Sequence, residues 1–166
     1  MTGESWNLDP PPGFRGLDPE RPITAYHRHL PHWRQDGATY FVTYRLADSL
    51  PQTKLRELDA WKREWLSKHG LRWTDWTSIA RSGLPREKWD EYARELMRKI
   101  ERWLDEGLGD CWLKRSDLRK FADDALCHFD GERYELGCYV VMPNHAHALI
   151  RPLHPAEYPL ERVLQG

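Results

Sequence analysis

Two histidines separated by a single residue, His145 and His147, are the side chains whose type and spacing most clearly suggest chemistry. In a β-strand the side chains alternate between two faces, so both imidazoles would project from one face with their Cα atoms about 6.6–7 Å apart. Imidazole nitrogens at this separation can converge on one metal ion, provided that both rings reach solvent. The plainer alternative is two polar residues on a solvent-facing strand, because no Asp or Glu on that strand supplies a third ligand.

The elements that would hold this pair follow from the hydrophobic pattern around it. Residues 133–142 alternate between the two faces of a strand, and the next strand begins at His145, so the two form a tight hairpin. Residues 39–46 are rich in β-branched and aromatic side chains and predict a further strand. The apolar residues that alternate with the histidines point to the opposite face and are expected to pack against helices. These residues are Ala146, Ala148 and Ile150.

Apolar residues at helical spacing predict two long helices within residues 51–70 and 89–107, which form an antiparallel, charge-rich pair. A third helix is expected from Ser116, as its N-cap, to Gly131, and another begins at Leu160. The order of strand, helical insertion, helix, strand, strand and helix is most of a ferredoxin-like βαββαβ unit. We therefore expect an α+β, ferredoxin-like antiparallel sheet whose final strand is missing, as if the chain were cut short.

The proline content separates an N-terminal arm from the rest of the chain. Six of the twelve prolines fall within the first 31 residues, which favours extended or irregular backbone over residues 1–36. Residues 37–166 then form one incomplete domain, with residues 51–107 as a helical-hairpin insertion.

The composition excludes several classes of protein. The 166-residue chain carries 25 Lys and Arg against 26 Asp and Glu, so it is not a histone-like polycation and has no bulk attraction to DNA. No apolar run is long enough to span a membrane, and the N-terminus lacks the features of a signal peptide. Three cysteines without metal-binding spacing favour the reducing cytoplasm, and Cys111, Cys127 and Cys138 are expected to be small core residues.

The stretch Arg133–Pro152, RYELGCYVVMPNHAHALIRP, resembles the signature of HUH-type tyrosine transposases of the insertion-sequence and REP-associated kind. In that signature a hydrophobic residue separates two histidines. The likeness includes the Met-Pro-Asn lead-in to the first histidine and extends upstream to Ala125. Tyr40–Leu46 is similar to the first strand of that family, and Leu30–Trp33 to its lead-in. The resemblance covers roughly residues 26–166, with the helical pair as an insertion.

The resemblance implies a mechanism. His145 and His147 would hold a divalent ion, Mg²⁺ or Mn²⁺, that polarises the scissile phosphate of single-stranded or hairpin DNA. A tyrosine on a later helix would attack the phosphorus and form a 5′-phosphotyrosine link. The family's nucleophile and a third polar ligand fall beyond the last residue of this sequence, while Tyr158 lies in a proline loop and does not match. We expect metal-dependent single-strand DNA endonuclease or transposase chemistry, with this chain inactive by itself.

Two alternative functions stay open from the sequence. The first is a non-catalytic remnant that binds hairpin DNA without cutting it. The second, from another class, is a metal-dependent hydrolase of small molecules that uses the same two histidines, although no further carboxylate or Gly-rich motif favours it. No membrane partner is expected, and assembly as a homodimer is left open.

Outside the histidine pair, the other candidate residues have plainer explanations. Arg28 and Arg34 are candidate DNA contacts in the arm. The remaining histidines of the arm lack a rigid support and are better explained as surface-loop residues than as a second metal cluster. Those histidines are His27, His29 and His32. Asp123 and Asp124 are adjacent and diverge in direction, so we expect a solvated helix face rather than a catalytic carboxylate pair.

Overall fold

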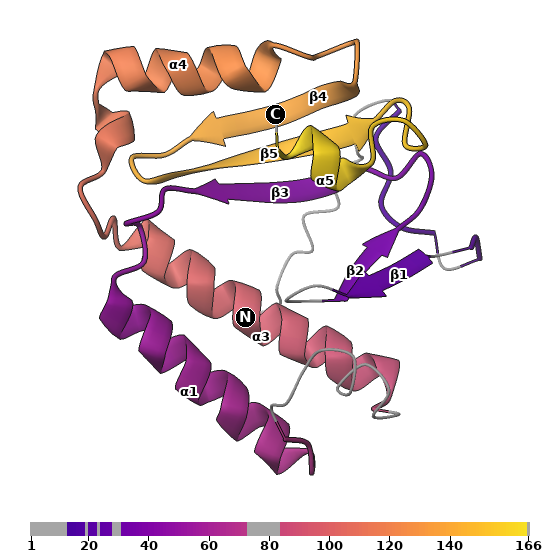
Figure 1. Cartoon of the computed structure of the whole chain (residues 1–166), viewed down its shortest axis with the longest axis vertical. Coiled ribbons are helices and arrows are strands. Elements are labelled where there is room, and N and C mark those ends of the chain that lie inside the picture. The colour runs from indigo at the N-terminus through magenta and orange to yellow at the C-terminus, as the bar shows by residue number, and fades with distance from the viewer. Residues whose placement is uncertain (1–12, 19, 23, 28–30, 73–83, 166) are drawn as a thin grey trace, which may run out of the picture.

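The computed structural model describes residues 13–18, 20–22, 24–27, 31–72 and 84–165. Its strands are β1 (Thr24–His27), β2 (Pro31–Arg34), β3 (Tyr40–Arg45), β4 (Tyr134–Val141) and β5 (His145–Pro152). Its helices are α1 (Gln52–Lys68), α3 (Arg86–Asp105), α4 (Ser116–Cys127) and α5 (Leu160–Val163), with a short 3₁₀ turn, η1 (Trp112–Lys114), before α4. The chain is therefore α+β, as the sequence predicts (Figure 1).

The central sheet has three antiparallel strands in the order β3-β5-β4. β5 lies in the middle, because it pairs with β4 through the tight hairpin and with β3 from the other side. The pairing matches the predicted strands closely, since alternating side chains specify both the strands and their buried face. The finer expectation, a ferredoxin-like fold, stays a prediction.

Helices cover one face of this sheet. Ala148 and Ile150 of β5 are buried there in a core with Val42 of β3 and Val163 of α5, and Leu126 of α4 packs against the same core. Figure 1 shows α4 alongside β4 and α5 beside the opposite end of the sheet. The prediction that the residues alternating with the histidines pack against helices is therefore confirmed for Ala148 and Ile150.

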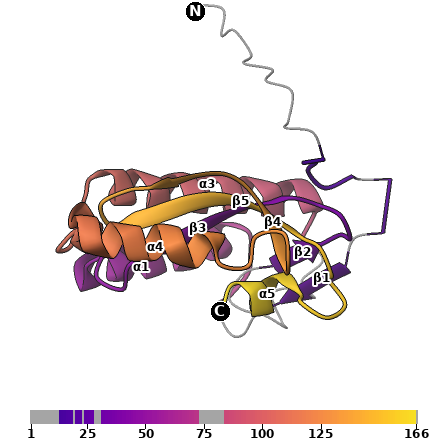
Figure 2. The ribbon, with the colours of Figure 1, turned by 90° about the horizontal axis from the view of Figure 1, so that it is seen from above.

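The helices α1 and α3 pack on each other around a separate core. Its fully buried members include Leu66 of α1 and Tyr92, Leu96 and Leu104 of α3. Figures 1 and 2 show this pair beside the β3 edge of the sheet, with the C-terminal end of α3 near the β4–β5 turn. None of the helices among the described residues is long and apolar enough to cross a membrane.

The structure corrects three expectations from the sequence. Part of the arm is extended, as expected, but β1 and β2 also pair as a two-stranded antiparallel sheet, which the sequence did not predict. Ser116 is the first residue of α4 rather than its N-cap; Arg115 takes that position and makes no side-chain capping bond. Cys111 is buried as expected, but Cys127 and Cys138 are exposed and therefore are not core residues.

Candidate metal centre

The histidine pair lies at the start of the central strand, on the face that α4 and α5 do not cover. Directly opposed residues of antiparallel strands share a face, so His147 lies beside Thr43, and His145 beside Arg45. The two imidazoles meet edge to face, and their Nε2 atoms are 3.0 Å apart. The structure thus brings together the two nitrogens that the sequence singles out, on one face of the strand.

Asn144 determines which nitrogen of His145 carries the proton. The side-chain amide nitrogen of Asn144 donates to the carbonyl oxygens of Leu104 and Leu108, at 3.2 and 3.0 Å. Because carbonyls only accept, the amide oxygen must be the atom that faces His145 Nδ1, 2.8 Å away. His145 Nδ1 is therefore the donor, and in the neutral ring Nε2 keeps a free lone pair directed at His147.

The Thr43 hydroxyl allows either ring nitrogen of His147 to carry the proton, whereas Asn144 fixes the proton of His145 on Nδ1. The hydroxyl lies 3.0 Å from His147 Nδ1 and can either donate to that nitrogen or accept from it. When Thr43 donates, His147 carries its proton on Nε2 and bonds to His145. When Thr43 accepts, both Nε2 lone pairs face each other, an arrangement that is stable only with a cation between them.

Burial keeps His145 neutral. The residue is only 1% exposed, whereas His147 is half-buried. Burial lowers the pKa of His145, and the neighbouring His147 lowers it further, while Asp105 acts in the opposite direction. A neutral imidazole is the form that binds metal. The metal site predicted from the sequence requires both rings to reach solvent. His145 does not meet that requirement, which counts against the site, and only His147 is open to solvent.

The donor set of this site is limited to two nitrogens. No group of three or more His, Cys, Asp or Glu residues that could hold a metal ion occurs in the part of the chain that the structure describes. Histidines that bind metals usually donate their other ring nitrogen to an oxygen acceptor, as His145 does to Asn144. The pair therefore fits a cation that takes nitrogen ligands and completes its shell with other groups, which suits Mn²⁺ better than oxygen-seeking Mg²⁺.

The sheet tyrosines lie on the opposite face from the histidines. Tyr40, Tyr44 and Tyr139 oppose the residues of β5 that alternate with the histidines, and Tyr134 opposes Pro152. Tyr158 likewise packs against the helix-covered core. None of these five hydroxyls is on the histidine face. Tyr158 thus occupies a packing position, consistent with its lack of match to the family's nucleophile.

The structure describes only one of the two arginines proposed as DNA contacts. Arg28 lies outside the described residues. Arg34, at the end of β2, forms an ion pair and a hydrogen bond with Glu161 of α5. It also lines a cavity of about 400 Å³ together with Tyr40 and Pro152, at the end of the sheet away from the histidine pair. Arg34 as a DNA contact stays a prediction.

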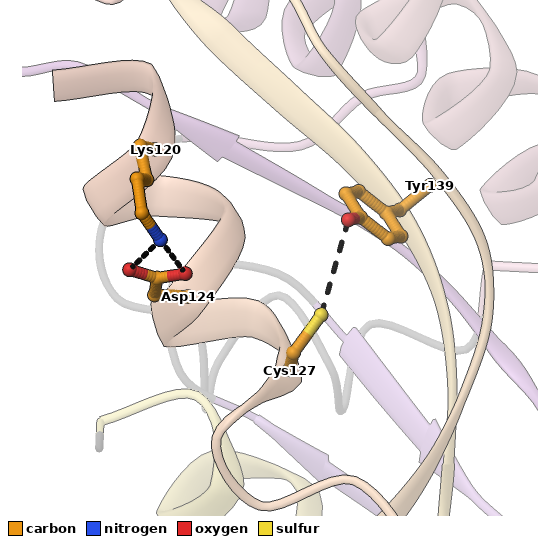
Figure 3. Close-up of polar contacts among 4 residues, drawn as sticks. All are labelled: Lys120, Asp124, Cys127 and Tyr139. Carbon is orange, nitrogen blue, oxygen red and sulfur yellow. Dashed lines mark hydrogen bonds and ion pairs between the residues drawn. The ribbon is translucent and has the colours of Figure 1, made fainter. Parts of the chain in front are cut away.

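The remaining candidates are surface groups near or on α4 (Figure 3). Asp124 is exposed and ion-paired with Lys120, as expected for a solvated helix face. The Cys127 thiol lies 3.8 Å from the Tyr139 hydroxyl, and this contact raises the pKa of Tyr139. Tyr139 is 39% exposed, so it is a surface residue of the hairpin.

His27 and His32 belong to the backbone of β1 and β2, where Tyr26 opposes His32 and His27 opposes Pro31. His29 lies outside the described residues. The explanation of the arm histidines as loop residues is therefore wrong for His27 and His32, because both lie in strands.

Sequence reasoning missed the two residues that orient the histidines, Asn144 and Thr43. Asn144 is part of the motif only as a lead-in residue, but its partners, Leu104 in the last turn of α3 and Leu108 just after that helix, are 40 and 36 positions away. Thr43 is 104 positions from His147 and becomes its neighbour only through the β3–β5 register. Comparisons of the chain with family models, curated proteins and solved structures found no significant match.

Proposed function

We propose that this chain is the metal-binding and DNA-binding part of a metal-dependent single-strand DNA endonuclease, of the tyrosine-transposase type that the His-Ala-His motif resembles. The observation that carries the proposal is the set of contacts from Asn144 through His145 and His147 to Thr43. Those contacts hold two imidazole nitrogens 3.0 Å apart, with the outer nitrogen of each ring already engaged. A bound divalent ion would supply Lewis-acid stabilisation of charge on a phosphate oxygen.

The fold supports the same proposal at a coarser level. β3 and β4 both pair antiparallel with β5, so they run parallel to each other on either side of it. With α4 between β3 and β4 in sequence, this order agrees with the split βαβ arrangement that the proposed ferredoxin-like sheet requires. In the proposal the helical pair α1–α3 is an insertion between β3 and α4, and the cytoplasm is the compartment, on the cysteine argument given above.

The chain's own residues bind and orient in this proposal, and they do not cleave. The phosphotyrosine chemistry needs a hydroxyl beside the metal, and the five tyrosines of the sheet and its C-terminal loop lie on the other face. When the chain is incubated with Mn²⁺ and hairpin DNA, we expect binding but no covalent protein–DNA adduct in a denaturing gel. An adduct would show that a nucleophile has been overlooked.

Titration calorimetry with MnCl₂ tests the metal site directly. The metal-free chain should release or absorb heat on titration, and His147→Ala should abolish that heat, because one imidazole alone binds weakly. His154→Ala is the matched control, since His154 is exposed and its side chain makes no contact with the pair. Circular dichroism of each variant checks folding. Unchanged heat in folded His147→Ala would refute the site.

Two further assays, hairpin-DNA binding and turnover of a phosphate ester, separate the two alternatives. A DNA-binding remnant would bind hairpin DNA equally well in Mn²⁺ and in chelator. A small-molecule hydrolase would turn over a simple phosphate ester in a manner that His147→Ala abolishes, without binding DNA.

A further inference from the structure

Strand β3 places three different side chains in a row beside the histidine pair. Phe41, Thr43 and Arg45 alternate along β3 and therefore share the face of His145 and His147. Thr43 is committed to His147, as described above. The other two stand on either side of it, about 13–14 Å apart along the strand.

Phe41 exposes its aromatic ring to solvent on the histidine face of the sheet. Its side chain is 58% exposed, and its ring lies nearly parallel to the His147 imidazole, with centroids 5.0 Å apart and planes at 22°. On the other side of His147, Val140 of β4 is 44% exposed. A strand face this apolar and this open, centred on a potential metal ligand, has a surface suited to a planar, partly apolar ligand.

Arg45 contributes an unused positive charge to the same face. It is exposed, and its guanidinium makes no ion pair or hydrogen bond with any residue that the structure describes. Other exposed arginines among the described residues, such as Arg56 and Arg98, are likewise unpaired, and Arg45 differs from them by its place on the histidine face. A free guanidinium favours phosphate, which it can contact through two parallel hydrogen bonds.

We propose that Phe41 and Arg45 form the binding surface for one strand of nucleic acid across the histidine pair, with a base stacked on Phe41 and a phosphate held by Arg45. The proposal rests on the proposed function and names the residues that would position its substrate. Aromatic side chains stack on every base, so this contact carries affinity without sequence preference. In a duplex the base faces are already stacked, and Phe41 could not reach them.

Charge distinguishes this occupant from a second copy of the chain. The centres of protein–protein interfaces are depleted in charged residues, because burying an unpaired charge is costly. A second copy that placed the same face against this one would bring like-charged Arg45 side chains into the interface. A phosphate neutralises that charge instead, so a polyanion with exposed ring systems is the better match.

Fluorescence anisotropy with a fluorescein-labelled single strand of about 16 nucleotides tests the proposal. In chelator, Phe41→Ala should weaken binding by about tenfold, and Phe41→Trp should retain it, because a larger ring stacks as well. Arg45→Gln should weaken binding and flatten its dependence on salt. Phe121→Ala is the matched control, since Phe121 is 74% exposed but lies on α4, away from the histidine face.

Each outcome supports or overturns a separate statement. Equal affinity for Phe41→Ala and wild type would refute the stacking surface, even if Mn²⁺ binding proves correct. Failure of the wild-type chain to bind the single strand would refute it as well, and a positive manganese titration would then still leave the metal site in place. A dimer that Phe41→Ala converts to a monomer in sedimentation would assign this surface to a second copy and overturn the proposal.

Discussion

Thr43 is the residue that allows His147 to move its proton from one ring nitrogen to the other. Its hydroxyl can reverse between donor and acceptor, whereas the Asn144 oxygen can only accept. Cation binding requires His147 to release the proton on Nε2 and place one on Nδ1. The reversal of the Thr43 hydroxyl stabilises that second form.

Replacement of Thr43 by Val should therefore weaken Mn²⁺ binding by about 10–100-fold, the usual effect of losing an outer partner of a metal-binding histidine. Thr43→Ser keeps the hydroxyl and should bind like the wild type. Manganese calorimetry of the two variants measures the difference. Equal Mn²⁺ affinities of Thr43→Val and Thr43→Ser would mean that metal binding by His147 does not depend on this hydroxyl.

Unlike the Thr43 hydroxyl, the buried hydroxyl of Tyr92 makes no hydrogen bond with the described residues. The residue is fully buried between α1 and α3, and burial raises its pKa to about 12. An unsatisfied buried polar group costs about 1–3 kcal/mol. Tyr92→Phe should thus leave the free energy of unfolding unchanged or raise it.

Tyr134→Phe is the matched comparison for this prediction. The Tyr134 hydroxyl donates to the carbonyl of Leu126 at 2.6 Å, so its loss should lower the free energy of unfolding by about 1 kcal/mol. Urea unfolding of both variants measures the sign of the change in the free energy of unfolding for each. A destabilised Tyr92→Phe would show that its hydroxyl has a partner after all.

The histidine pair could be predicted from the sequence because its spacing of two is the period of a strand. The residues that orient the pair could not. Thr43 and Asn144 act through partners that are distant in sequence, so their roles depend on the register of β3 and on the position of the α3 C-terminus. The burial of His145 escaped prediction for the same reason.

Among the elements, β4 contains an irregularity built around Gly137. The pairing with β5 shifts between Leu136 and Tyr139. A Cβ atom at Gly137 would lie 2.8 Å from Phe14 Cε1 and 2.9 Å from Leu149 Cβ. The N-terminal segment can therefore cross this part of the sheet only because residue 137 has no side chain.

Gly137→Ala should lower the free energy of unfolding by about 1–3 kcal/mol, because Leu149 Cβ belongs to the neighbouring strand and cannot move away. The neighbouring Cys138→Ala, at an exposed position, should change it little. Urea unfolding of both variants measures these differences. Wild-type stability in Gly137→Ala would mean that Phe14 does not pack where the structure has it.

The long elements were predictable, and the short ones were not. The apolar stripe of α3 repeats over five turns, and the alternation in β5 extends over the whole strand, so local pattern and tertiary contacts agree there. In β4 the irregularity near Gly137 breaks the predicted alternation, because Tyr139 opposes Ala148 and Val140 opposes His147. β1 and β2 have four residues each, and Pro31 begins β2. Proline argues against a strand except at its first residue or at an edge, and that exception applies here.

For the whole molecule, His145 gives stability a defined dependence on pH. A histidine in the unfolded chain has a pKa near about 6.5, whereas burial lowers the pKa of native His145. As the pH falls below about 6.5, the unfolded chain takes up this proton before the folded chain does, so the free energy of unfolding should decrease.

Urea unfolding at about pH 7.5 and about pH 5.5, with chelator present, measures this decrease on either side of the histidine value. His145→Asn should show a smaller decrease, since the titrating group is gone. His154→Asn, at an exposed site, should retain the wild-type dependence. Identical pH dependence in the wild type and His145→Asn would contradict the assignment.

Asn144 connects the two hydrophobic cores of the molecule. Its amide nitrogen donates to the carbonyls of Leu104, in the last turn of α3, and of Leu108, just after it, and its amide oxygen faces His145. Any ligand that shifts α3 relative to the hairpin must also disturb the acceptor of His145, and must thereby change the affinity of the histidine pair. By thermodynamic reciprocity, a cation bound by the histidine pair and any ligand that shifts α3 would change each other's affinity by the same factor, so Asn144 couples the helical insertion to the site.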